Sequence, residues 1–281
     1  MRHLLTLGHG YSAQALARRL LAAGWEVTGT TRDPAQLPVM AAAGVTAVLL
    51  PADPSDIETA LARASHILVS AAPDETGDPF LRQFGPQIRA ARPDWLGYLS
   101  TTSVYGDRGG DWVDEDSDLL PETDRGRERV EAERDWLASG LPVHIFRLAG
   151  IYGPGRGPLE KARRGGPAVV KPGQVFGRIH VDDIAQVLEA SIRRPCPGRA
   201  YNVCDDEPAP AEEVLDYAAA LLGLPAPRRV AFDPAGMSEM ARSFYTECKR
   251  VRNDRIRTEL GVALLYPTYR EGLAAQIAAT A

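Results

Sequence analysis

The chain has 281 residues, of which 44% are hydrophobic and 25% charged, with a formal net charge of -5 and a pI near 5.6. This length allows one large or two smaller domains with a sizeable core, and a mildly acidic chain offers no basic surface for nucleic acid. The three cysteines, at 196, 204 and 248, form no CxxC pair. They indicate neither a disulfide framework nor a zinc site, so we expect no metal and a reducing cytoplasm.

Short apolar runs alternate with longer amphipathic stretches, a pattern typical of βαβ units around a parallel sheet. The first apolar run is too brief for a signal peptide, and we expect no membrane segment elsewhere. We expect strands at residues 3–7, 26–30, 46–50, 66–71, 95–102, 142–147 and 200–203. We expect helices at 11–23, between the second and third strands, at 79–92, 122–139, 181–193 and 212–222, and over most of 239–260. The predicted fold class is α/β, a Rossmann-type doubly wound parallel sheet with a smaller C-terminal α+β substrate region.

The alternation of strand and helix patterns ends after Gly150, where glycine and proline become frequent. We therefore divide the chain, with a soft boundary, into a dinucleotide-binding Rossmann domain at residues 1–155 and a substrate-binding region at residues 156–281. The two are expected to be interleaved. The chain shows no internal repeat and no low-complexity tract.

A phosphate-binding pattern, GHGYSA, lies directly after the first strand and opens the first helix. Gly8 permits a tight turn, Gly10 lets the backbone approach a pyrophosphate, and Ala13 allows close packing of helix and strand. The helix N-terminus attracts the anion. We therefore predict that the cofactor-binding residues of this segment are Gly8, Gly10, Tyr11, Ser12 and Ala13.

The end of the second strand should show which dinucleotide binds. An NAD-selective site usually places an acidic side chain there for the ribose 2′-hydroxyl. This chain instead offers hydroxyl groups followed by Arg32, which could pair with a 2′-phosphate. NADP is therefore favoured over NAD, although Arg32 could also be a solvated loop charge.

Several motifs resemble those of the extended short-chain dehydrogenase/reductase superfamily, which includes nucleotide-sugar epimerases and dehydratases. Besides the glycine turn, residues 100–106 resemble its SSxxVYG segment, residues 147–155 its RxxxxYGPG stretch and residues 178–183 its HVDD segment. The resemblance runs nearly end to end. It implies that Asp53 holds the adenine, that Thr101 occupies the catalytic Ser/Thr position, and that the fourth strand lines the cofactor through Ala71, Ala72 and Pro73.

One motif of that superfamily is missing. Its members carry a YxxxK pair, in which the Tyr moves a proton and the Lys lowers the pKa of the Tyr and binds the nicotinamide ribose. Here residues 106–141 contain neither tyrosine nor lysine, and Arg125 and Arg129 stand at the two positions. Arg129 could keep the charge and the ribose contact, but a guanidinium at position 125 is a poor proton shuttle. The chain is thus identified as an atypical, epimerase/dehydratase-like member of the superfamily that lacks the active-site Tyr.

Other residues could supply the chemistry. Thr101 could donate a hydrogen bond to a substrate oxygen, while Tyr105 and Tyr152 lie on loops at the carboxyl ends of strands, where ligands bind. Either phenol could enter the cleft, or both could pack the loops. The lysines at 161, 171 and 249 lie far away in the sequence. The candidate catalytic residues are therefore Thr101, Arg129 and Tyr105.

The substrate side is expected to be cationic, because Arg127, Arg147, Arg156 and Arg178 fall in segments that would face the ligand. Guanidinium groups suit phosphate or carboxylate, and Arg178 resembles the position that binds a nucleotide diphosphate in sugar-modifying relatives. The alternative is that these arginines are ordinary surface residues. The candidate substrate-binding residues are Arg127, Tyr152, Arg178 and His180, and an anionic or nucleotide-sugar-like substrate is one hypothesis.

Two functions remain open. The first is an NAD(P)-dependent oxidoreductase or epimerase-like enzyme with a non-standard mechanism, acting on a small molecule. The second is a non-catalytic NAD(P)-binding sensor or scaffold that has lost the proton shuttle. Relatives commonly form dimers through the helices after the fourth and fifth strands, so a homodimer is possible, although the charged surface of residues 122–134 argues against that packing.

Overall fold

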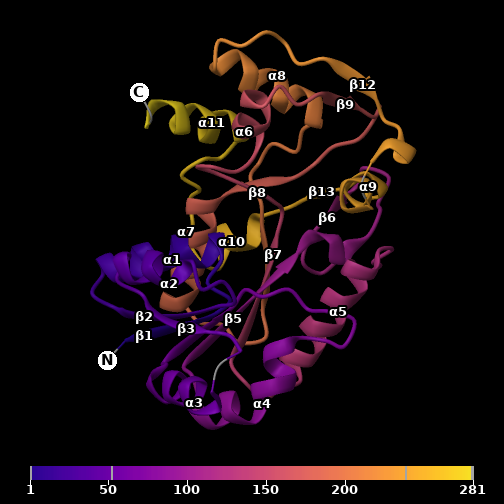
Figure 1. The fold of residues 1–281 in the computed structure, drawn as a ribbon. Helices are drawn as coiled ribbons and strands as arrows, with labels where there is room; N and C mark the ends of the chain where they lie inside the picture. The colour runs from indigo at the N-terminus through magenta and orange to yellow at the C-terminus, as the bar shows by residue number, and fades with distance from the viewer. Residues whose placement is uncertain (1, 52, 238, 280–281) are drawn as a thin grey trace. The chain divides into compact units, whose positions relative to one another are not determined.

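A seven-stranded parallel sheet has the strand order β11-β7-β5-β4-β1-β2-β3. Figure 1 labels β1, β2, β3, β5 and β7 of this sheet. Its strands are β1 (His3–Leu7), β2 (Glu26–Thr31), β3 (Thr46–Leu49), β4 (His66–Val69), β5 (Trp95–Thr101), β7 (Val143–Leu148) and β11 (Ala200–Val203). Strands β1, β5 and β7 are buried almost throughout, as expected of a parallel sheet covered on both faces. The order reverses between β1 and β4, which confirms the predicted doubly wound Rossmann-type fold.

The computed structural model describes residues 2–51, 53–237 and 239–279. Clustering of the chain gives two compact units, each made of three segments. The first contains Met1–Ser100, Arg127–Arg147 and Ile184–Tyr201, and the second contains Thr101–Gly126, Leu148–Asp183 and Asn202–Ala281. The predicted boundary after residue 155 concerns functional domains and stays a prediction.

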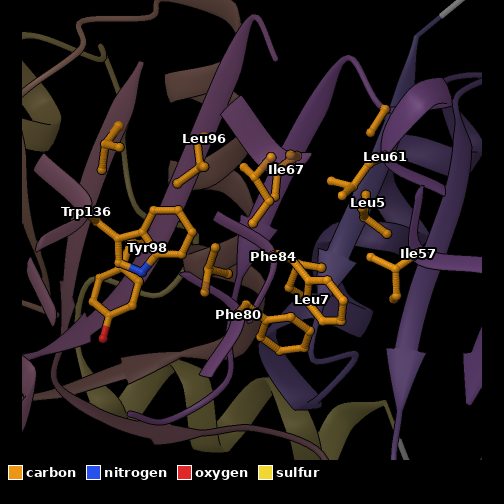
Figure 2. Packing of buried hydrophobic residues seen from close by; sticks show 14 of the residues in the cluster. Leu5, Leu7, Ile57, Leu61, Ile67, Phe80, Phe84, Leu96, Tyr98 and Trp136 are labelled. Carbon is orange, nitrogen blue, oxygen red and sulfur yellow. The ribbon is translucent and has the colours of Figure 1, made fainter. Parts of the chain in front are cut away.

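Helices cover both faces of the sheet in the first unit. These helices are α1 (Tyr11–Ala22), α2 (Gln36–Ala42), α3 (Pro54–Arg63), α4 (Pro79–Ala91), α5 (Asp124–Leu137) and α7 (Val181–Arg193). On one face α3, α4 and α5 pack on the strands, and Figure 2 shows Ile57, Phe84 and Trp136 in this core. On the other face Trp95 of β5 donates from Nε1 to Ser191 Oγ of α7 over 3.1 Å.

The second unit is built from short strands and helices. Its strand pairs are β8 (Gly150–Tyr152) with β10 (Arg178–His180), β9 (Ala168–Val170) with β12 (Arg229–Ala231), and β6 (Trp112–Val113) with β13 (Arg250–Val251). Its other elements are α6 (Pro158–Arg163), α8 (Ala211–Leu221), α9 (Glu239–Thr246), α10 (Asp254–Thr258), α11 (Tyr269–Ala278), and the 3-10 turns η1 (Thr102–Tyr105) and η2 (Pro234–Gly236). Tyr152, Leu159, Leu215 and Tyr269 form its core with their neighbours.

Two elements differ from the expected pattern. No helix was predicted for Pro54–Arg63, yet α3 forms there and buries Ile57 and Leu61 against the sheet. The mainly helical stretch expected at residues 239–260 is interrupted, because Arg250–Val251 pairs with β6 between α9 and α10. Among the helices that the structure describes, none is long and apolar enough to span a membrane.

Candidate functional site

The first glycine of the phosphate-binding turn is fixed by its surroundings. Gly8 has a φ of 90°, and a Cβ added there would lie 3.0 Å from the amide nitrogen of Ala71. The Gly8 amide donates to Thr30 Oγ1 over 2.7 Å, and Ser70 Oγ donates to the Gly8 carbonyl over 3.0 Å. The turn is therefore held between the ends of β2 and β4 in a conformation that favours glycine.

The N-terminus of α1 is suited to an anion. Gly10 is its N-cap residue, no side chain caps it, and its first turn carries no acidic residue. By contrast, the side chains of Asp53 and Asp78 cap α3 and α4. The amide groups and dipole of an uncapped helix end form a binding site for phosphate. The residues present thus fit a dinucleotide pyrophosphate, with the first-turn amides supplied by Tyr11, Ser12 and Ala13.

His9, between the two glycines, packs inward. Its Nδ1 lies 2.8 Å from Thr6 Oγ1, and a Cβ added at Gly29 would lie 2.7 Å from its ring. Burial lowers the pKa of His9 from 6.5 to about 4. The imidazole is therefore neutral near pH 7 and supports the turn.

This pKa predicts a pH-dependent stability. Because the unfolded chain binds more protons at His9 than the folded chain between pH 4 and 6.5, stability should fall as the pH falls through this window. The substitution His9→Gln removes that titration. We expect the Tm of the wild type to fall more steeply than that of H9Q between pH 6.5 and 4.5. Parallel curves of Tm against pH would contradict the assignment.

The other predicted cofactor residues lie at strand ends of the first unit. Arg32 is exposed directly after β2. Asp53 is exposed, and its Oδ1 accepts from the amide and the hydroxyl of Ser55 over 2.9 and 2.6 Å, which lowers the pKa of Asp53. It therefore caps α3, and its contact with adenine stays a prediction. Beyond β4, Ala71 is half-buried, Ala72 exposed and Pro73 buried.

The predicted catalytic residues of the second unit are both engaged within the fold. Thr101 is half-buried and caps η1, since its Oγ1 accepts from the Ser103 amide over 3.2 Å. Tyr105 is fully buried and donates from its hydroxyl to Asn202 Oδ1 over 2.7 Å. A catalytic role for Tyr105 stays a prediction, and its phenol points into the core of the unit.

The two arginines at the YxxxK positions differ in exposure. Arg125 is exposed on α5. Arg129 is half-buried, and its Nη1 donates to Tyr98 Oη over 3.0 Å and to the Leu99 carbonyl over 2.8 Å. Arg129, at the lysine position, is therefore hydrogen-bonded to β5.

Tyr152 and His180 lie together in the second unit. Their rings meet edge to face, with centroids 5.2 Å apart, and both side chains are buried. The hydroxyl of Tyr152 faces the Thr268 carbonyl at 3.5 Å, and burial raises the pKa of Tyr152. Nδ1 of His180 accepts from the Asp182 amide, and burial lowers the pKa of His180. Neither ring is exposed to solvent.

Arg178 lies in the same unit, whereas Arg127 is exposed on α5 in the first unit. Arg178 is 9% exposed. Its guanidinium lies 5.8 Å from the ring centre of Tyr269 and donates from Nη1 to the carbonyls of Phe176 and Ala209. Burial lowers the pKa of Arg178. Its Nε and Nη2 make no hydrogen bond to any residue that the structure describes.

The sequence interpretation missed a lysine that lies near the SSxxVYG-like segment. Lys249 is buried and donates from Nζ to the Gly106 carbonyl over 2.8 Å and to Glu247 Oε2 over 2.6 Å. Lys249 thus lies far from this segment in the sequence and next to it in the fold. Its separation of 143 residues from Gly106 left no signal in the sequence.

Arg147 is another residue whose environment was misjudged. It follows the expected cationic pattern in the sequence, but it is buried in an ion pair with Glu133, at 2.8 Å between Nη2 and Oε2. Ser100 Oγ donates to the same carboxylate over 2.5 Å. Within residues 2–51, 53–237 and 239–279, no group of His, Cys, Asp or Glu side chains is arranged to hold a metal ion.

Comparison with known proteins supports a dinucleotide site. A family model described as NAD(P)H-binding matches residues 8–195. The protein YeeZ of Escherichia coli K12 is 33% identical over 285 residues, covering 95% of this chain and 97% of YeeZ. A 3-diazoavenalumate denitrifying reductase from a Streptomyces species is 32% identical over 206 residues, covering 66% of each chain.

Solved structures show the same fold. A functionally unknown conserved protein from Silicibacter pomeroyi is 55% identical, with a TM-score of 0.93 and coverage of 100% of this chain and 99% of that one. A dTDP-glucose 4,6-dehydratase from Bacillus anthracis in complex with NAD has a TM-score of 0.78 over 99% and 96% of the chains, but at 17% identity it shows the fold alone. The chain belongs to the NAD(P)H-binding family, with the Rossmann-type fold of the epimerase/dehydratase-like short-chain dehydrogenase/reductases.

Proposed function

We propose that the protein is an NADP(H)-linked oxidoreductase of a small anionic substrate. The observation that carries the proposal is the glycine turn, in which Gly8 leaves no room for a Cβ and α1 presents an uncapped N-terminus. Such a turn accepts a dinucleotide pyrophosphate. Arg32, exposed after β2, supports NADP(H) as the preferred form because a guanidinium can pair with a 2′-phosphate.

The chemistry must proceed without the usual phenol. When bound, the nicotinamide supplies or accepts a hydride. Tyr105 and Tyr152 are buried and directed at protein acceptors, and the exposed Arg125 cannot shuttle a proton near neutral pH. The half-buried Thr101 can still donate a hydrogen bond to a substrate oxygen. The residues therefore favour a substrate whose reduction needs no proton from a tyrosine.

The name of the Streptomyces relative supports this class. That relative is a 3-diazoavenalumate denitrifying reductase, so its name describes a reductase that acts on a diazo compound. When hydride reaches a carbon that bears a diazonium group, the C–N bond pair leaves with dinitrogen, and no oxyanion has to be protonated. We therefore propose reduction of a small carboxylate-bearing electrophile, ahead of oxidation or epimerisation of a nucleotide sugar.

The anionic character of the substrate rests on the arginines. Arg178 keeps Nε and Nη2 free of bonds to described residues, and Arg127 is exposed. A guanidinium with two adjacent N–H groups suits a carboxylate or a phosphate. We propose that Arg178 and His180 belong to the substrate-binding residues.

The test is calorimetric binding followed by turnover. We expect NADPH to bind at least about tenfold more tightly than NADH, which corresponds to about 1.4 kcal/mol. Consumption of bound NADPH should then be followed with carboxylated aryl diazonium salts, simple carbonyl compounds and nucleotide sugars. Oxidation of NADPH by the first class supports the proposal. Binding of neither dinucleotide would contradict it.

A second candidate is a non-catalytic NAD(P)-binding sensor or scaffold. It is favoured by the burial of Tyr105 and Tyr152 and by the hydrogen bonds from Arg129 to β5. Tight binding of NADPH without turnover of any compound in the panel would support this candidate over the enzyme.

A further inference from the structure

Arg129, at the family's lysine position, donates a hydrogen bond to a backbone carbonyl near the end of β5. β4 pairs with β5 only as far as Val69, which lies opposite Tyr98. The next amides of the chain, those of Ser70 and Ala71, donate to the carbonyl of Leu7. The Leu99 carbonyl therefore lies beyond the paired part of β4, and Arg129 donates to it over 2.8 Å.

The same guanidinium satisfies a buried phenol. Tyr98 is fully buried, and Figure 2 shows its ring beside Trp136, with ring centroids 6.3 Å apart. Its hydroxyl accepts from Arg129 Nη1, and the guanidinium lies 5.6 Å from the ring centre. Without Arg129 this hydroxyl would lose its charged donor inside the core.

A buried carboxylate completes the surroundings. Asp78 is almost fully buried, and its Oδ1 accepts from the amides of Phe80 and Leu81 at the start of α4. The Trp136 side chain acts on the same carboxyl as a hydrogen-bond donor and lowers its pKa. Burial raises the pKa of Asp78, and the hydrogen bonds from Leu81, Trp136 and Phe80 oppose this rise. The positive charge of Arg129 adds a smaller effect in the same direction as these hydrogen bonds.

We propose that Arg129 is a positioning residue, which holds the end of β5 and the inner face of α5 together, and that it does not bind the nicotinamide ribose. Turning the side chain toward a ribose would leave the Leu99 carbonyl and the Tyr98 hydroxyl without their donor and would remove the nearby charge from Asp78. The strand that Arg129 holds continues directly to Thr101. The part that concerns the ribose rests on the proposed function.

The experiment compares Arg129→Ala, Arg129→Lys and Tyr98→Phe, with Arg125→Ala as the exposed control on the same helix. We expect R129A to lower the Tm by about 3 to 8 °C and to leave the Kd for NADPH within about threefold of the wild type. R129K should recover at least half of the lost Tm because an ammonium can still donate to both oxygens. R125A should change neither quantity.

Further readouts separate positioning from general destabilisation. Amide hydrogen exchange of residues 99–101 should accelerate at least about tenfold in R129A and not in R125A. The double variant R129A/Y98F should melt no lower than R129A, because Tyr98 and Arg129 act through one contact. If R129A does not fold, the Y98F and R129K measurements still decide the question.

Two results would overturn the inference. One is a loss of NADPH affinity of tenfold or more in R129A with an unchanged Tm. The other is additivity of the R129A and Y98F losses of Tm. If the wild type binds no NADPH, the proposed function fails, whereas the hydrogen-exchange and double-variant results still test the positioning role.

Discussion

The substitution Gly10→Asp is expected to lower the affinity for NADPH at least about 100-fold, while the Tm changes by less than about 3 °C. A carboxylate at this N-cap would face the pyrophosphate, and two like charges about 4 Å apart repel by about 4 kcal/mol at an effective dielectric constant near 20. The fold should tolerate the change. Among the described residues, a Cβ at Gly10 has Ser70 Oγ, at 3.9 Å, as its one neighbour within 4 Å, and aspartate is a favourable N-cap residue.

The matched control is Gly10→Ala, which adds the Cβ without the charge. We expect G10A to lose less than about tenfold in affinity, so that the comparison separates electrostatic from steric effects. Affinities are measured by titration calorimetry at low and high salt, since repulsion should weaken as salt screens it. Wild-type affinity in G10D would mean that the pyrophosphate does not lie at the N-terminus of α1.

The glycine turn could be predicted because its determinants are local. A buried apolar run, Gly8 and the amphipathic helix that starts at Tyr11 follow one another within 20 residues. The right-handed crossover of βαβ units then fixes the face of the sheet on which each connecting helix lies. α3 was missed although Ile57, Ala60 and Leu61 have helical spacing, because the ten-residue stretch also contains Asp56, Glu58 and Arg63 and its apolar signal is weak.

The directions of the site's side chains could not be predicted, because their partners are distant in the sequence. Tyr105 donates to Asn202, 97 residues away, and Lys249 reaches Gly106 over 143 residues. Arg129 turns toward β5 because β4 stops pairing at Val69, which is a property of the sheet and not of α5. A motif thus predicts the position of a residue on its element. Tertiary contacts decide which of its polar atoms remain available to a ligand.

The second large effect concerns the buried ion pair that joins α5 to β7. Removing the cation with Arg147→Met should cost about 3–5 kcal/mol of the free energy of unfolding, because it leaves the carboxylate of Glu133 uncompensated. The side chains of Arg147 and Glu133 are only 7% and 3% exposed, and Nε and Nη2 of Arg147 bond the carboxylate over 2.8 to 3.3 Å. The expected fall in Tm is about 6 to 20 °C.

The control is an ion pair on the outer face of the same helix. Arg134 and Asp135 approach to 3.7 Å with side chains 73% and 51% exposed, so Arg134→Met should cost less than about 0.5 kcal/mol. Unfolding in urea, followed by circular dichroism, measures both variants. Equal losses in R147M and R134M would show that burial does not govern the strength of the Glu133–Arg147 pair.

The double variant Glu133→Leu/Arg147→Met tests whether the ion pair stabilises the fold more than two apolar side chains at the same positions would. Because replacing both charges by apolar groups removes the desolvation cost, we expect it to recover most of the stability lost in R147M. Any remaining loss then belongs to the hydrogen bond from Ser100 Oγ to Glu133. Arg129, Glu133 and Trp136 lie at helical spacing on the inner face of α5, and Arg129 and Glu133 contact the strands through polar groups. If the double variant is stable but its residues 99–101 exchange amide hydrogens faster, the ion pair specifies the position of α5 more than it stabilises the fold.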